Sequence, residues 1–319
     1  MESFNNKIAV VTGGGTGMGR ELVCQLAAAG AHVAMCDVSQ ENMDETARLA
    51  QTDGLRLTSH LCDVSSESQV LAFRDQVLEQ HETDHINLLF NNAGIGGGGS
   101  FVEGDREEWE RTFAVCWEGV YFGCRAFMHA LVASDEGHIV NTSSVNGFWA
   151  SIGTTQAHTS YAAAKFAVKG FTEALVTDLR LHAPHVHCSV VMPGHIGTSI
   201  MENSSKVLGK PWGLDLPEAD VSAIRERMLA AGLPVGNVPD DHIRQMLADR
   251  AEAFRTKAPT SAGEAASVIL GAVQTKRWRV LVGEDAYALD SLVREAPEDA
   301  YEKSMIDKIR ALNHLGELI

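Results

Sequence analysis

The sequence predicts an α/β fold in which a doubly wound parallel sheet of about seven strands has helices on both faces. Two observations carry this prediction. Short apolar or β-branched runs alternate with helix-length amphipathic segments over most of the 319 residues, a rhythm typical of βαβ units. The first of those runs also leads directly into a glycine-rich turn that a helical pattern follows.

Seven runs are expected to form strands because they are short, apolar and rich in β-branched residues. These candidate strands are Ile8–Val11, His32–Cys36, Leu55–His60, Asn87–Phe90, His138–Asn141, Val186–Val191 and Arg279–Val282. The clearest candidate helices between them are Arg20–Ala29, Glu67–Gln80, Trp109–Val132 and Tyr161–Leu181. In such a sheet a ligand crevice is expected beyond the carboxyl ends of the strands.

The whole chain, residues 1–319, is expected to form a single domain with two additions to the alternating pattern. The first addition, about 199–258, holds many apolar residues and four of the chain's eight prolines. We interpret it as a partly helical flap over the substrate crevice rather than as a solvated linker. The second addition is a C-terminal extension, about 284–319, whose acidic first part is expected at the surface or in a subunit interface.

The composition favours a protein that acts on small molecules. The chain carries 42 acidic residues against 26 Lys and Arg, a net charge of −16, which disfavours binding to nucleic acid or to anionic membranes. No apolar run approaches the length that spans a bilayer, and the start lacks the pattern of a secretory signal. The six cysteines are scattered, which favours reduced thiols. These features predict a cytoplasmic protein.

The glycine-rich turn Thr12–Gly19 has the pattern of a nucleotide-binding loop. Gly13 permits a tight turn off the strand, Gly17 allows a pyrophosphate close to the backbone, and Gly19 allows the helix to pack near the sheet. Free N–H groups at the start of the helix attract phosphates. A purely structural turn is the alternative, but the strand before and the helix after favour a Rossmann-type dinucleotide site.

Asp37 ends the second candidate strand, where an acidic side chain accepts hydrogen bonds from the adenosine ribose. A 2′-phosphate there would meet a like charge, which costs about 1 kcal/mol in water and several when partly buried. Neither Thr16 in the loop nor Val38 after the aspartate offers a compensating cation. The cofactor is therefore predicted to be NAD, with an NADPH-linked reductase as one alternative and a helix cap or turn role for Asp37 as another.

Tyr161 and Lys165 lie four residues apart at the start of a candidate helix, so their side chains share one face. Thr159 or Ser160 is a candidate cap for that helix. A tyrosine with a pKa near 10 needs roughly 4 kcal/mol to reach about 7. An ammonium about 5 Å away supplies roughly 3 kcal/mol at an effective dielectric of 20, and a helix end adds to it. The pair therefore suits proton exchange in an alcohol–ketone conversion, although Y-x-x-x-K also occurs on ordinary helices.

Taken in order, these motifs resemble the short-chain dehydrogenase/reductase family from residue 7 to about residue 200. The stretches that match the family are Thr12–Gly19, Cys62–Val64, the NNAG motif Asn91–Gly94, Ser143–Ser144, Tyr161–Lys165 and the PGxIxT-like Pro193–Thr198. The resemblance implies an NAD-dependent oxidoreductase that acts on CH–OH groups. It also implies a homo-oligomer, either a dimer or a tetramer, because the helices that match Trp109–Val132 and Tyr161–Leu181 form subunit contacts in relatives.

The resemblance also implies roles for individual residues. Ser144 would orient the substrate oxygen, Tyr161 would exchange the hydroxyl proton, and Lys165 would bind the nicotinamide ribose and lower the Tyr161 pKa. The implied cofactor contacts are Gly13, Thr16, Gly17, Met18, Gly19, Asp37, Val38, Asp63, Val64, Asn92, Ala93, Gly94, Tyr161, Lys165, Pro193, Gly194, Ile196 and Thr198. The substrate contacts we expect are Ser144, Trp149 and His195 in a pocket for a bulky, apolar alcohol or ketone.

Two features depart from the family pattern. Cys116 stands where the family usually has an asparagine, and a thiol is a weaker hydrogen-bonding partner for a proton relay. A catalytically weak nucleotide-sensing or scaffolding protein therefore remains a rival hypothesis. The interval from Ser144 to Tyr161 is also longer than usual, and extra residues around Ile152–His158 are expected to form a rim on the pocket.

Two further patterns are assigned no chemistry. His81 and His85 spell the H-E-x-x-H zinc pattern, but a candidate strand begins just after His85, so the two are not expected on one helical turn. No metal is therefore predicted. The run Gly96–Gly99 is expected to be a flexible loop.

Overall fold

A seven-stranded parallel sheet forms the centre of the computed structural model, which describes residues 1–50, 54–152, 157–230 and 232–311. Its strands are β1 (Ile8–Thr12), β2 (His32–Asp37), β3 (Leu57–Leu61), β4 (Leu88–Asn91), β5 (Gly137–Thr142), β6 (Val186–Pro193) and β9 (Arg279–Val282). Their order across the sheet is β3-β2-β1-β4-β5-β6-β9, and all neighbours pair in parallel. The predicted doubly wound sheet is confirmed.

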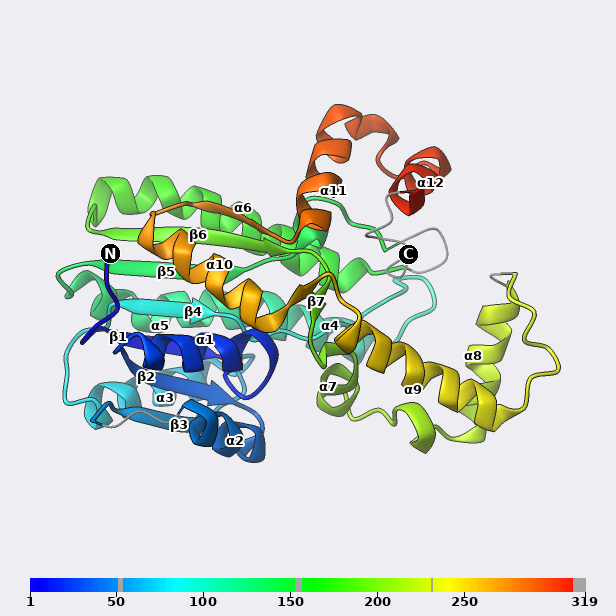
Figure 1. Ribbon diagram of the computed structural model, residues 1–319, viewed down its shortest axis with the longest axis horizontal. Coiled ribbons are helices and arrows are strands. Elements are labelled where there is room, and N and C mark those ends of the chain that lie inside the picture. Colours follow the sequence, from blue (N-terminus) through cyan, green and yellow to red (C-terminus); the bar gives the residue numbers. More distant parts are fainter. Residues whose placement is uncertain (51–53, 153–156, 231, 312–319) are drawn as a thin grey trace.

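Helices cover both faces of this sheet (Figure 1). The α-helices of the described residues are α1 (Gly17–Ala28), α2 (Gln40–Ala50), α3 (Glu67–Gln80), α4 (Arg106–Phe113), α5 (Gly119–Val132), α6 (Thr159–His182), α7 (Ile200–Val207), α8 (Glu218–Ala230), α9 (Asp240–Thr256), α10 (Ala262–Gln274), α11 (Glu284–Glu295) and α12 (Lys303–Ala311). Because strand residues point alternately to the two faces, Ile8 and Val10 of β1 join the core under α3, α5 and α6. Ala9 and Val11 join the core under α1, α2 and α10.

The structure corrects two predicted elements. The strand expected at Leu55–His60 is β3, Leu57–Leu61, because a turn with Gly54 at φ 85° delays its start. The helix expected over Trp109–Val132 is α4 and α5 with a π-helical turn, Ala114–Glu118, between them.

The region predicted to be a flap contains α7, α8 and α9, and its two ends meet. Residues 196–197 (β7, Ile196–Gly197) pair in parallel with residues 260–261 (β8, Thr260–Ser261). Between these ends α8 and α9 pack on each other around a small separate core of Leu216, Val221 and Ile243, and they project beyond the carboxyl ends of the strands (Figure 1). This two-stranded pairing anchors the base of the flap to the main body.

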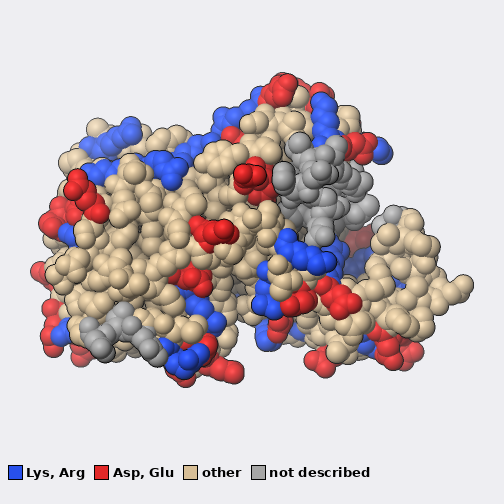
Figure 2. All heavy atoms as spheres, in the orientation of Figure 1, with Lys and Arg blue, Asp and Glu red and all other residues tan. Residues whose placement is uncertain are grey.

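The C-terminal extension packs on the segment that follows β5. Trp149 is buried with Leu289, Met305 and Ile309 of α11 and α12, and its indole Nε1 donates to the Ala300 carbonyl at 2.7 Å. The extension and the flap therefore flank the same end of the sheet. Within the described ranges, no helix has both the length and the apolar character to cross a membrane. On the face shown in Figure 2, acidic and basic side chains lie both around the edges and across the middle.

Candidate active site

The glycine loop between β1 and α1 is shaped by close approach to β4. Gly13 and Gly17 have φ of 67° and 53°, values that favour glycine. A Cβ at Gly13 would lie 2.8 Å from the Ala93 Cα. The Thr12 hydroxyl accepts hydrogen bonds from the backbone N–H groups of Asn92 at 3.0 Å and Ala93 at 3.1 Å. One side chain thus joins the glycine loop to the NNAG segment.

Asp37 lies beside this loop with its carboxylate partly used. Its Oδ2 accepts from the Gly15 N–H at 3.0 Å and its Oδ1 from the Ser39 N–H at 3.1 Å. A carboxylate has about four acceptor positions, so positions remain for ribose hydroxyls. Sequence reasoning missed Arg20, the cation beside this loop, whose guanidinium donates to the Gly15 carbonyl and to the Thr46 hydroxyl. Arg20 is placed one helical turn into α1, so its position follows only from the fold.

Asp63 has partners that sequence reasoning also missed. Its Oδ2 forms an ion pair with Arg111 of α4 at 2.7 Å, and its Oδ1 accepts from the Ser65 backbone and hydroxyl. Burial acts to raise the pKa of the Asp63 carboxyl, but Arg111 and Ser65 outweigh it and hold the pKa below its usual value. The Asp63 carboxylate is therefore engaged by protein groups on both of its oxygens.

Ser144, Tyr161 and Lys165 come together at the carboxyl end of β5. Ser144 caps a short helical turn after β5, and its Oγ accepts from the Asn146 N–H at 3.1 Å. The Lys165 Nζ lies 5.4 Å from the centre of the Tyr161 ring and donates to the Thr142 carbonyl at 2.9 Å. An ammonium has three donors, so Lys165 retains donors for a further ligand.

Burial dominates the acid–base behaviour of this cluster. It raises the pKa of Tyr161 above its usual value, the Cys116 thiol adds to that rise, and a hydrogen bond from Ser144 opposes it. Burial likewise lowers the pKa of Lys165. In the protein alone the Tyr161 pKa is therefore raised, not lowered as the sequence predicted, because burial disfavours the charged phenolate.

The start of α6 is capped by backbone carbonyls from a distant segment, not by the side chain of Thr159 or Ser160 as predicted. The backbone N–H groups of Thr159 and Ser160 donate to the carbonyls of Gly99 and Gly98, both at 3.0 Å. Gly98 has φ 59°, and a Cβ there would lie 2.3 Å from the Ser160 Cβ. The glycine run is therefore packed against the start of α6, and it fixes the turn that carries Tyr161.

His158, the last residue of the predicted rim on the pocket, lies directly before α6. Its ring centre is 4.6 Å from that of Tyr161, with the planes tilted by 36°. Burial lowers the pKa of His158 to about 4, so the imidazole is neutral at physiological pH. The rest of the predicted rim, residues 153–156, lies outside the described residues.

Cys116 sits within the π-helical turn and is fully buried. Its Sγ donates to the Ile95 carbonyl at 3.2 Å. A Cβ at Gly94 would lie 3.5 Å from the Lys165 Nζ and 3.9 Å from the Cys116 Sγ. Gly94 thus lies against both the buried Lys165 ammonium and the Cys116 thiol, and that thiol donates to a backbone carbonyl.

The segment Pro193–Thr198 continues from β6 towards the glycine loop. A Cβ at Gly17 would lie 3.1 Å from the Thr198 Cγ2. The His195 ring is buried and lies 4.1 Å, centre to centre, from Phe254 of α9. His195 and Trp149 were both predicted to contact substrate. His195 packs against the flap, and Trp149 packs against the C-terminal extension.

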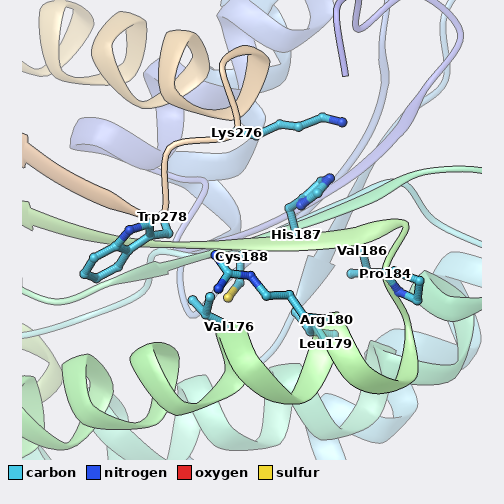
Figure 3. Close-up of a pocket in the computed structure, with 9 residues that line it drawn as sticks. All are labelled: Val176, Leu179, Arg180, Pro184, Val186, His187, Cys188, Lys276 and Trp278. Carbon is cyan, nitrogen blue, oxygen red and sulfur yellow. The ribbon is translucent and has the colours of Figure 1, made fainter.

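Two other places in the molecule lie away from this cluster. His81 ends α3, where its Nε2 pairs with the Thr58 hydroxyl at 3.1 Å. A cavity of about 250 Å³ lies at the amino end of β6, lined in part by Arg180 and Lys276 (Figure 3). In Figure 3 His187 and Lys276 lie on one side of β6 and Arg180 on the other, so these groups do not converge on one ligand.

The residues at this end of the sheet fit a dinucleotide. The glycine loop and the start of α1 present backbone N–H groups, which suit a pyrophosphate. Asp37 suits a ribose diol, and the Lys165 donors suit a second ribose. The Asn92 Oδ1 is buried and has no partner in the part of the chain that the structure describes. An acceptor is thus available at the point where the NNAG segment meets the glycine loop.

Comparison with known proteins gives a consistent result. The family model described as short chain dehydrogenase matches residues 7–208. A putative oxidoreductase, SadH, of Mycobacterium tuberculosis is 39% identical over 210 residues, which are 66% of this chain and 74% of that protein.

Two solved structures extend the comparison. A short chain dehydrogenase/reductase from Burkholderia phymatum in complex with NAD has a TM-score of 0.73 and 30% identity, over 93% of this chain and 96% of that one. A metagenomic short-chain oxidoreductase in complex with NADP has a TM-score of 0.53 and 32% identity, over 60% of this chain and 84% of that one. Both nicotinamide dinucleotides thus occur among similar proteins.

Proposed function

The chain belongs to the short-chain dehydrogenase/reductase family, and on that basis we propose that it interconverts a secondary alcohol and a ketone with NAD(H). The observation that carries the proposal is the meeting of Ser144, Tyr161 and Lys165 beside the glycine loop. Family membership makes the protein an oxidoreductase that binds a nicotinamide dinucleotide. The choice of substrate and of NAD over NADP is our proposal.

The three side chains have distinct tasks in the proposed reaction. Ser144 hydrogen-bonds the substrate oxygen and orients it, as its bond to Tyr161 places it within reach of the same atom. Lys165 holds the nicotinamide ribose through the donors that Thr142 leaves free. The bound cofactor supplies the hydride acceptor and, when oxidised, a positive charge beside Tyr161. As the phenolate, Tyr161 would accept the hydroxyl proton while the carbinol carbon loses hydride to the cofactor, and as the neutral phenol it would return that proton in the reverse direction.

The remaining cofactor contacts follow the geometry of the loop. We propose that Gly13, Thr16, Gly17, Met18 and Gly19 cradle the pyrophosphate. Asp37 and Val38 bind the adenosine ribose, Asp63 and Val64 the adenine, and Asn92, Ala93 and Gly94 the central part of the cofactor. Pro193, Gly194, Ile196 and Thr198 hold the nicotinamide. NAD is preferred because Asp37 would repel a 2′-phosphate and Arg20 is engaged by backbone and hydroxyl partners.

An apolar substrate is favoured by the surroundings of Tyr161. The core cluster against which Tyr161 packs includes Ile95, and Val207 and Leu208 at the end of α7 pack on the same cluster. A bulky apolar group would replace water against these side chains at a gain of about 25 cal/mol per Å². We further propose a cytoplasmic, homo-oligomeric enzyme whose single domain includes the flap and the C-terminal extension.

Purified protein given NAD and a panel of hydrophobic secondary alcohols should produce NADH. Tyr161→Phe removes the proton carrier and keeps the ring, so turnover should fall by about 10²- to 10⁴-fold while the Kd for NADH changes little. Full activity in this variant would reject the mechanism. If the wild-type protein binds NADH tightly but turns over no alcohol of the panel, the rival hypothesis of a nucleotide-sensing or scaffolding protein is favoured. That hypothesis rests on Cys116, which replaces the usual asparagine.

A further inference from the structure

A buried carboxylate from the C-terminal part of the chain lies directly behind the segment that we propose holds the nicotinamide. Asp285 is in the first turn of α11, and its side chain is 1% exposed. Its Oδ2 accepts a hydrogen bond from the His195 backbone N–H at 2.5 Å. A residue 90 positions downstream thus holds the turn between Gly194 and Ile196.

The backbone around Asp285 is fitted to this carboxylate. A Cβ at Gly194 would lie 2.1 Å from the Asp285 Oδ2, and a Cβ at Gly283 would lie 2.3 Å from its Oδ1. Gly283 is also the cap of α11, with φ 98°. Any side chain at either glycine would displace the carboxylate, so two glycines are needed to keep it in place.

The environment is costly for a charged group, and this argues for a specific task. The Asp285 Oδ1 is buried and has no partner in the residues that the structure describes. Burial raises the pKa of Asp285, although the His195 and Ala286 N–H groups oppose that rise. An apolar residue in the same space would avoid the desolvation penalty but would leave the His195 N–H without an acceptor, so the task of this carboxylate is to hold that N–H.

The contact acts on one end of the proposed nicotinamide segment. Gly194 is joined to Val282 of β9 by its N–H at 2.9 Å, and Ile196–Gly197 pairs with Thr260–Ser261. Between these two anchors the His195 N–H is held by Asp285. The orientation of the backbone that leads to Ile196 and Thr198 therefore depends on this carboxylate.

We propose that Asp285 is a positioning residue that sets the nicotinamide-binding geometry of residues 193–198. The proposal rests on the proposed function, since that function assigns this segment to the nicotinamide. Asp285 does not touch the reacting atoms; it acts through the His195 backbone. Its loss should therefore weaken the nicotinamide half of the cofactor selectively and leave the adenosine half bound as before.

Isothermal titration of NADH and of ADP-ribose, which lacks the nicotinamide, separates these halves. Asp285→Ala should raise the ratio of the NADH Kd to the ADP-ribose Kd about tenfold, which corresponds to 1.4 kcal/mol for a lost charge-assisted bond. Asp285→Asn keeps an acceptor without the charge, so its ratio should rise about threefold. If the alanine variant does not fold, the asparagine variant decides the question on its own.

Asp290→Ala is the matched control. Asp290 lies on the same helix and is buried, but its partners are Arg279 and Arg294. Its loss should lower the thermal midpoint and leave the Kd ratio unchanged. An unchanged ratio in both Asp285 variants, or an equal rise in the Asp290 control, would overturn the positioning role while the proposed function stands. A wild-type protein that binds neither NADH nor ADP-ribose would overturn both.

Discussion

Replacement of Thr12 by valine tests the connection between the glycine loop and the NNAG segment. The valine is nearly isosteric, but it leaves the N–H groups of Asn92 and Ala93 without the acceptor that both use. A buried donor left without a partner costs about 1–3 kcal/mol. Thr12 itself is buried while its two partners are partly exposed, so a total near 3 kcal/mol is expected. That is a large part of the ~5–15 kcal/mol by which a typical protein is stable.

Thr12→Ser is the matched control, because it keeps the hydroxyl and loses one methyl group, a change of about 1 kcal/mol. The difference of about 2 kcal/mol between the variants should separate their thermal midpoints by roughly 3 °C in a chain of this size. Circular dichroism melting without cofactor measures it. A valine variant that melts at the same temperature as the serine variant would show that the two hydrogen bonds do not connect the segments as argued.

Three further outcomes are expected. Asp37→Asn keeps the acceptors and removes the charge, so the ratio of the NADPH Kd to the NADH Kd should fall by about fivefold; a wild-type protein that binds NADPH more tightly than NADH would contradict the NAD assignment. Burial lowers the pKa of His138 to about 3, from an ordinary 6.5. The unfolded chain then binds more protons between these values, and stability falls as pH drops from about 6.5 towards 3. His138→Gln should flatten that fall in urea unfolding, and superimposable profiles would exclude the contribution. Trp149→Phe leaves a backbone carbonyl of the C-terminal extension without its donor, so the thermal midpoint should fall by a few degrees, whereas Trp278→Phe at a 41% exposed position should leave it unchanged.

Local patterns in the sequence were enough to predict the sheet and the proximity of Tyr161 to Lys165, whereas Ser144 was added to them by the family resemblance. Lys165 follows Tyr161 by one helical turn, so a helix alone brings them to one face. The glycine loop is likewise a contiguous motif between a strand and a helix. A doubly wound parallel sheet then places both motifs at its carboxyl edge.

What could not be predicted depends on contacts between distant parts of the chain. The carbonyls of Gly98 and Gly99 cap α6, although composition alone suggests a flexible loop there. The pairing of Asp63 with Arg111 requires α4 to pack near the end of β3. Asp285 has no sequence motif that relates it to residues 193–198. Charges and caps supplied from outside a segment follow only from tertiary packing.

The short pairing of β7 with β8 has an evolutionary consequence. Because residues 196–197 meet residues 260–261, the intervening segment leaves and re-enters the body at one point, with its own small core in α8 and α9. The family match ends at residue 208, early in this segment. A module closed at its base in this way can be lengthened, shortened or exchanged without disturbing the sheet to which it is attached.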